Sequence, residues 1–240
     1  MNAPSSREPE VLVMGNPNTG KSTLFNRITG LNQKVSNYPG VTVERVTGSL
    51  RLKSCNATIV DVPGTYSLTA SSPDEMIAVD SLTGAVGDDQ VPDLVVAVLD
   101  ACNLRRNMFL LSQILESERP IVVALNMVDR IEKEGVEIDS AELEKQIEVP
   151  VIPISATQGK GIEALLNAIE VSLTSPRKGK TIRNRDFENK LLKLSQDLAT
   201  HSEIDPLPDL VLRRAVLDEG GHAEVRVVAH YGPDSVRILE

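Results

Sequence analysis

A segment rich in glycine and proline separates two apolar stretches near the start of the chain, and it restricts the fold more than any other feature. This segment reads VMGNPNTGKST over residues 13–23. Residues 11–14 have the apolar character of a short buried strand, and residues 22–28 have the apolar spacing of a helix. Because glycine and proline break both kinds of element, we expect a sharp bend that joins a strand to a helix.

The bend has the spacing Gly15-x4-Gly20-Lys21-Ser22, the pattern of a phosphate-binding loop in its strand–loop–helix context. In such a loop the backbone N–H groups turn into one concavity, and the following helix adds the positive end of its dipole. Lys21 is expected to reach the β and γ phosphates, and Ser22 to offer its hydroxyl to Mg2+. We predict that the phosphates of a nucleotide are bound by Gly15, Asn16, Pro17, Asn18, Thr19, Gly20, Lys21, Ser22 and Thr23. The alternative is a glycine-rich turn that only joins the two elements.

Apolar runs alternate with helical patterns from residue 10 to about residue 174. We predict strands over residues 10–15, 47–52, 57–62, 94–99, 120–125 and 150–154. We predict helices over residues 21–29, 73–85, 104–117, 139–148 and 160–174. This alternation predicts an α/β fold of the P-loop class with a mainly parallel, doubly wound sheet. In such sheets the ligand-binding groups gather at the carboxyl ends of the strands.

The composition limits the classes of partner. The net charge is −9 and the pI is near 5.0, which argues against binding of nucleic acid through a basic surface. The two cysteines, Cys55 and Cys102, indicate neither a disulfide framework nor a cysteine-based metal site, and free thiols suit a reducing compartment. The N-terminus lacks the apolar core of a signal peptide, and the apolar runs are too short to span a bilayer. We therefore expect this chain by itself to be water-soluble.

Two features at the end of one predicted strand suit the phosphates of a nucleotide. The strand over 57–62 ends in the sequence DVPG, residues 61–64. The Asp61 carboxylate could hold Mg2+ through water, and the Gly64 amide could approach a γ phosphate with no Cβ in the way. Taken alone, this sequence would also suit an ordinary Pro-Gly turn after a strand. Its value lies in following a phosphate-binding loop.

Two other strand ends suit a guanine base. The sequence NMVD, residues 126–129, follows an apolar strand, and the Asp129 carboxylate could accept hydrogen bonds from guanine N1–H and the exocyclic amine. The sequence SAT, residues 155–157, follows the last strand, where the Ala156 amide could donate to guanine O6. We predict that the base is bound by Asn126, Met127, Asp129, Ser155, Ala156 and Thr157.

The four short sequences GNPNTGKS, DVPG, NMVD and SAT resemble those of translation-factor-related small GTPases. The longer segments GNPNTGKSTLFNRITG, VSNYPGVTVER, DVPGTYSLTASSPDE, LDACNLRRNMFLLSQILE and ALNMVD are similar to the cytosolic G-protein domain of the ferrous iron transporter family FeoB. The resemblance covers residues 10 to about 174. It implies a GTPase that binds GTP and GDP and regulates Fe2+ uptake. Its partner would be a membrane transport domain, as the C-terminal continuation of the same polypeptide, at the cytoplasmic face of the bacterial inner membrane.

The resemblance also implies roles in hydrolysis. In that family Thr42 would be the switch threonine that ligates Mg2+ and senses the γ phosphate, and Asn18 would ligate K+ beside the phosphates. Here Thr65 occupies the position where a glutamine often orients the attacking water, so we expect slow intrinsic hydrolysis that K+ stimulates. Asn18 could instead only stabilise its own loop. The residues expected to act in hydrolysis are Asn18, Lys21, Thr42 and Gly64, with Ser22, Thr42 and Asp61 as Mg2+ ligands.

One further departure concerns the base. Met127 replaces the lysine that commonly lies along the ring, and its polarizable side chain can still cover that ring.

The expected organisation is a disordered N-terminus over residues 1–9, a GTP-binding domain over 10–174, a linker over 175–180, and a small helical or mixed subdomain over 181–240. Residues 186–200 and 207–221 read as helices, whereas 223–239 alternates apolar and polar residues and reads as a hairpin. This tail matches the family's helical bundle poorly. It is either a reduced form of that bundle or packs differently, and dimerisation stays open.

The three histidines, His201, His222 and His230, lie in the tail, and we interpret them as surface residues.

Two alternative functions share the same short sequences. One is a free-standing GTPase in ribosome or tRNA maturation, which usually carries a basic RNA-binding appendage that this acidic chain lacks. The other is a nucleotide-binding interaction module with negligible turnover, which the missing glutamine would suit.

Overall fold

The sheet is the scaffold of the first two thirds of the chain. The computed structural model describes residues 7–38, 42–69, 72–84, 91–181, 184–202, 204–218, 220–235 and 239. In these residues seven strands form one sheet in the order β2-β3-β4-β1-β5-β6-β7. The strands are β1 Glu10–Gly15, β2 Gln33–Asn37, β3 Glu44–Arg51, β4 Asn56–Asp61, β5 Leu94–Asp100, β6 Ile121–Asn126 and β7 Val151–Pro153. β2 and β4 pair with β3 in antiparallel register and all other neighbours are parallel, which confirms the predicted fold class.

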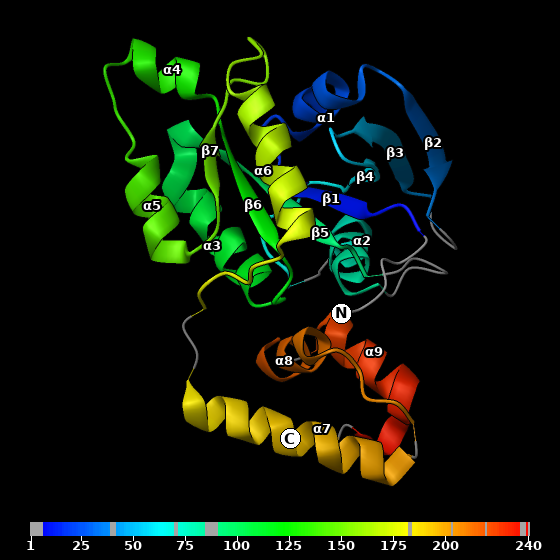
Figure 1. The fold of residues 1–240 in the computed structure, drawn as a ribbon. Coiled ribbons are helices and arrows are strands. Elements are labelled where there is room, and N and C mark those ends of the chain that lie inside the picture. The colour runs from blue at the N-terminus through cyan, green and yellow to red at the C-terminus, as the bar shows by residue number, and fades with distance from the viewer. Residues whose placement is uncertain are drawn as a thin grey trace.

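Helices cover both faces of the sheet because alternate strand residues point to opposite sides (Figure 1). These helices are α1 Lys21–Thr29, α2 Pro73–Thr83, α3 Leu104–Leu115, α4 Val128–Lys133, α5 Ser140–Ile147 and α6 Ile162–Thr174, with a short 3-10 helix η1 at Ala101–Asn103. In β1, Val11 and Val13 pack under α1 and α6, whereas Leu12 and Met14 pack toward α2 and α3. The continuous apolar runs of β1, β5 and β6 are thus buried on both sides.

The sequence patterns missed β2 and α4. β2 lies inside the segment that was expected to be a loop, and all five of its residues, QKVSN, are exposed. An edge strand with no buried face shows no alternation of apolar and polar residues, so it gives no periodic signal. α4 has six residues, too few for a helical period to be read.

The N-terminus is attached to the sheet earlier than predicted. Residues 1–6 of the segment expected to be disordered lie outside the described residues. From residue 7 onward the chain is bonded: Arg7 pairs with Asp93 at 3.0 Å, and the Pro9 carbonyl accepts a hydrogen bond from the Thr58 amide at 2.8 Å.

The C-terminal tail is helical throughout its described elements. It contains α7 Arg185–Ser202, α8 Asp209–Leu217, α9 His222–Tyr231 and the 3-10 helix η2 Pro233–Ser235. The hairpin predicted over residues 223–239 is wrong. Ala223 and Val227 are buried four residues apart while Val225 between them is 63% exposed, which is a helical rather than a strand pattern.

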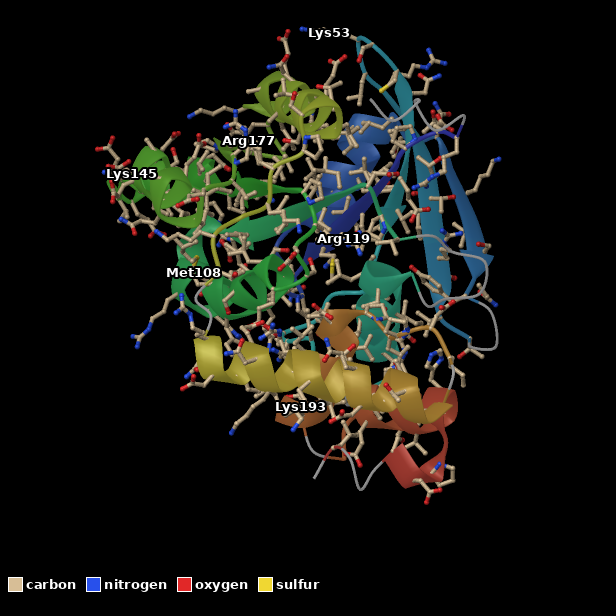
Figure 2. The ribbon with its side chains drawn as sticks, turned by 60° about the horizontal axis from the view of Figure 1, so that its bottom comes forward. Lys53, Met108, Arg119, Lys145, Arg177 and Lys193 are labelled. Carbon is tan, nitrogen blue, oxygen red and sulfur yellow. The ribbon has the colours of Figure 1, made fainter. Side chains whose placement is uncertain are left out.

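The tail packs against the α2–α3 face of the sheet domain. Leu210 of α8 joins the apolar cluster formed by that face. On α9, Arg226 and His222 both contact the Asp80 carboxylate of α2, at 2.9 and 3.2 Å. The interpretation of His222 as a surface residue is therefore wrong, because its ring is half-buried in this contact. Figure 2 brings this side of the molecule forward and shows α7, which carries the labelled Lys193, in front of the other helices of the tail.

Candidate functional site

The bend between β1 and α1 forms a tight loop at the carboxyl edge of the sheet. Gly15 ends β1 where a Cβ would lie 2.4 Å from the Val98 carbonyl oxygen of β5, so only glycine fits there. Asn18 and Gly20 both have positive φ, 65° and 86°, and α1 begins at the next residue. The Thr19 hydroxyl donates to the Asn16 carbonyl at 2.9 Å and closes the turn. The local sequence therefore shapes this loop through backbone conformations that few residues adopt.

Lys21 and Asp61 form the charged centre of the site. The Lys21 ammonium is almost buried and donates to the Asn16 carbonyl at 3.4 Å. Burial lowers the pKa of Lys21, and the nearby Asp61 charge opposes that shift. Burial likewise raises the pKa of Asp61, against the charge of Lys21 and the hydrogen bond from Ser22. Each charge is desolvated, so each gains from a partner of opposite sign in the site.

The donor set around Asp61 suits a divalent cation. The Ser22 hydroxyl donates to one carboxylate oxygen of Asp61 at 3.1 Å. The other oxygen, Oδ1, is buried and has no hydrogen-bond partner in the described part of the chain. A carboxylate and a hydroxyl side by side, with one oxygen left unsatisfied, fit Mg2+, which prefers oxygen ligands.

The DVPG loop lies directly on the phosphate-binding loop. A Cβ on Gly64 would stand 2.9 Å from Lys21 Nζ and 3.0 Å from the backbone of Pro17. The next residue, Thr65, is buried, and its hydroxyl donates to the Ser67 carbonyl at 2.6 Å. The Thr65 side chain is thus engaged in its own loop and offers no group to the phosphates.

Asn126 connects the phosphate-binding loop to the loop after β7. Its Nδ2 donates to the Thr19 carbonyl at 2.8 Å, and its Oδ1 accepts from the Ala156 amide at 2.9 Å. A Cβ on Gly20 would lie 2.4 Å from Asn126 Nδ2, so glycine at position 20 is needed for this contact as well as for its positive φ. The sequence patterns did not reveal that Asn126 bonds to both loops.

The remaining residues predicted to bind the base lie beside Asn126. Met127 has a φ of 65° and opens α4, and its Cε lies 3.7 Å from the Cβ position of Gly20, against the phosphate-binding loop. The Asp129 carboxylate accepts from Gln158 Nε2 at 3.2 Å. Ser155 is fully buried, and its hydroxyl lies 3.2 Å from that of Thr157.

Arg27 is a contact that sequence reasoning missed. From the last turn of α1, its Nε donates to the Ala156 carbonyl and its NH2 donates to the Thr157 carbonyl at 2.6 Å. The two partners are 129 and 130 residues away in sequence, so no local pattern could have indicated the pairing. Gln158 was missed for the same reason.

Two predicted residues stand apart from this cluster. Thr42 is exposed in a bend before β3, and no hydrogen bond joins it to the phosphate-binding loop among the residues that the structure describes. Thr23 is exposed on the first turn of α1. The other predicted residues meet along one edge of the sheet.

Comparison with known proteins identifies the family. The family described as ferrous iron transport protein B matches residues 9–169. This chain belongs to that family. The Fe(2+) transporter FeoB of Salmonella typhimurium is 48% identical over 162 residues, which are 66% of this chain and 20% of that protein. The chain therefore spans a fifth of the length of this curated relative.

Solved structures of the family resemble nearly the whole of this chain. The cytosolic domain of L. pneumophila FeoB is 34% identical with a TM-score of 0.75, covering 96% of this chain and 94% of that one. A GDP-bound mutant of S. thermophilus NFeoB is 32% identical with a TM-score of 0.75, covering 97% and 90%. At this coverage the C-terminal helices have counterparts in both structures. Among the described residues, no helix has both the length and the apolar character needed to cross a bilayer.

Proposed function

We propose that this chain is a GTP-binding and GTP-hydrolysing domain that regulates ferrous iron uptake through a membrane transporter. One observation carries the proposal: a phosphate-binding loop, a desolvated Lys–Asp pair and the NMVD and SAT loops meet at one sheet edge in a chain of this family. The membrane transport domain would be the C-terminal continuation of the same polypeptide, at the cytoplasmic face of the bacterial inner membrane. The length of the relatives supports this, since the chain corresponds to 20% of the matched transporter.

Phosphate binding would use Lys21, Ser22 and Asp61, which lie close together beside the phosphate-binding loop. Lys21 would exchange its long 3.4 Å bond to the Asn16 carbonyl for phosphate oxygens. The Ser22 hydroxyl and, through water, Asp61 would hold Mg2+, with Thr42 joining when its loop closes over the γ phosphate. A Cβ on Gly64 would lie 2.9 Å from Lys21 Nζ and 3.0 Å from the backbone of Pro17, so the lack of a side chain there would let the Gly64 amide approach that phosphate.

Base recognition would follow from the loops that Asn126 joins. Asp129 would accept from guanine N1–H and the exocyclic amine, and the Ala156 amide would donate to O6, sharing or leaving its bond to Asn126. Adenine offers neither the N1–H and amine pair nor the oxygen in that arrangement. A site built on such hydrogen bonds rejects the wrong base strongly, because its buried polar groups stay unpaired.

Hydrolysis would depend on the positive charge of bound cations rather than on a side chain that orients water. The Thr65 hydroxyl donates to the Ser67 carbonyl of its own loop, which supports a slow intrinsic rate of hydrolysis. Asn18 is exposed, and no hydrogen bond of its side chain is present in the described residues, so its amide oxygen is available to K+. Bound Mg2+ and K+ would supply positive charge where negative charge develops between the β and γ phosphates.

Single-turnover GTP hydrolysis in matched K+ and Na+ buffers tests the proposal. We expect faster hydrolysis in K+ by roughly one to three orders of magnitude, on the scale of charge stabilisation by an arginine finger. Asn18→Ala should lose the K+ response and keep its affinity for GDP. Equal rates in both salts would remove K+ and Asn18 from the mechanism. If GTP were bound without turnover in either salt, the chain would be a nucleotide-dependent interaction module.

A further inference from the structure

Arg27 holds the loop that would read the base. It projects from α1, the helix that follows the phosphate-binding loop, and donates to two consecutive carbonyls, those of Ala156 and Thr157. Its side chain is exposed and has no carboxylate partner among the described residues, although the chain carries an excess of acidic groups. The guanidinium is therefore committed to the backbone of this one loop.

The loop is fixed from two opposite sides. On one side Asn126 accepts from the Ala156 amide, and on the other side Arg27 binds the Ala156 carbonyl. The loop also makes room for the arginine: a Cβ on Gly159, whose φ is 81°, would lie 2.9 Å from Arg27 NH1. A planar guanidinium with several donors suits two neighbouring carbonyls, whereas a single ammonium would satisfy them less well.

We propose that Arg27 is a positioning residue for guanine recognition. It fixes the backbone of Ala156 and Thr157 in place, so that the Ala156 amide, which donates to Asn126 Oδ1 in this structure, can be shared with guanine O6, and it links this loop to the helix that follows the phosphate-binding loop. This inference rests on the proposed binding of a guanine nucleotide. Loss of the arginine should shorten the lifetime of bound GDP and weaken the contribution of O6 in particular.

A second contact provides a matched comparison in the same loop. Gln158 Nε2 donates to the Asp129 carboxylate at 3.2 Å. Asp129 would read the N1–H and amino side of guanine, so Gln158 acts on the other half of base recognition. If Arg27 has the role proposed, the two variants Arg27→Ala and Gln158→Ala should affect different atoms of the base.

The experiment measures dissociation constants for GDP, 6-thio-GDP, IDP and ADP by calorimetry, and the GDP dissociation rate by stopped flow. In 6-thio-GDP a weakly accepting sulfur replaces O6, whereas IDP keeps O6 and lacks the 2-amino group. The proteins are wild type, Arg27→Ala, Arg27→Lys, Gln158→Ala and, as a remote exposed arginine, Arg177→Ala. Thermal unfolding of each variant checks that the fold is retained.

We expect wild type to prefer GDP over 6-thio-GDP by about tenfold, the usual worth of such a hydrogen bond. In Arg27→Ala that preference should fall toward one, GDP should dissociate about tenfold faster, and the preference for GDP over IDP should persist. Arg27→Lys should lie between the two, and Arg177→Ala should match wild type. Gln158→Ala should instead lower the preference for GDP over IDP.

Two results would overturn the inference. One is an unchanged preference for GDP over 6-thio-GDP in Arg27→Ala. The other is an equal loss of both preferences in both variants, which would mean that the loop is only loosened as a whole. If wild type bound ADP as tightly as GDP, the proposed function itself would fail, and that outcome is distinguishable from the other two.

Discussion

The two ends of the proposed nucleotide site are held together by different kinds of contact. The phosphate end, residues 15–22, is closed by short-range bonds such as those from Thr19 and Lys21 to the Asn16 carbonyl. The base end, residues 126–129 and 155–158, is held by contacts between distant parts of the chain, including Asn126 with Thr19 and Arg27 with Ala156. The phosphate end is thus shaped by its own sequence, whereas the base end takes shape only when the sheet is assembled.

This difference predicts distinct consequences for mutations at the two ends. Changes at the phosphate end should weaken every nucleotide alike, because all share the same phosphates. Changes at the base end should alter the preference among bases. A residue that touches both ends should do both.

The largest effect should come from Lys21→Ala. This change removes the buried ammonium that would face the phosphates and leaves Asp61 desolvated without its opposite charge. We expect a loss of about 4 kcal/mol in nucleotide binding, or roughly a thousandfold, as for other truncated buried charge pairs. GDP and IDP titrations should show equal losses. A change in their ratio would contradict the separation of the two ends.

Gly20→Ala should be next, since Gly20 lies where the two ends meet. Its φ is 86°, and an added Cβ would stand 2.4 Å from Asn126 Nδ2. Gly30→Ala is a matched control at the other end of α1, where φ is 62° and nothing lies within 4 Å of the Cβ position. Denaturant unfolding should show about 1 kcal/mol lost for Gly30→Ala and about 3 kcal/mol for Gly20→Ala, because only the latter adds a clash to the backbone strain. Equal losses would show that the Asn126 contact yields freely.

The same difference explains how far the sequence alone could predict the site. Gly15, Lys21 and Ser22 stand in one contiguous pattern, and the strand ends at Asp61 and Asn126 follow apolar runs that are easy to recognise. Arg27 and Gln158 carry no such signal. Their hydrogen-bond partners come close to them only when α1 and the loop after β7 pack against the sheet. Contacts over such sequence separations can be seen only in three dimensions.

The fold shows the same limit. The buried strands β1, β5 and β6 could be predicted because burial on both faces leaves a continuous apolar run. β2 could not, since an exposed edge strand imposes no pattern. In α9 Val225 and Val227 imitate strand alternation, and only the packing of Ala223 and Val227 against α7 and α8, with Val225 left exposed, reveals the helical period.

Asp129→Asn should change specificity at the base end. The amide cannot accept from both N1–H and the exocyclic amine, so we expect GDP affinity to fall by about 2 kcal/mol, roughly thirtyfold. The new amide can donate to the second carbonyl of xanthine, so XDP should bind the variant better than it binds wild type. Calorimetric titrations with GDP, XDP and ADP would check this. A variant that lost GDP and gained nothing for XDP would argue that Asp129 supports the loop through Gln158 and does not contact the base.

The smallest effect should come from Ser22→Ala, which removes a proposed metal ligand from the phosphate end without removing a charge. The Ser22 hydroxyl donates to Asp61 Oδ2 at 3.1 Å, while Asp61 Oδ1 has no hydrogen-bond partner among the residues that the structure describes. With the hydroxyl gone, Asp61 alone would hold Mg2+ at this point, and GTP affinity at limiting Mg2+ should fall by about 1 kcal/mol, roughly fivefold. Chelation with EDTA provides the control, because without metal the two proteins should bind GTP with equal affinity. The preference for GDP over IDP should also be unchanged, since no base contact is altered. If Ser22→Ala instead bound GTP like wild type at limiting Mg2+, the hydroxyl would serve only to orient Asp61, and the metal would rest on Asp61 and Thr42.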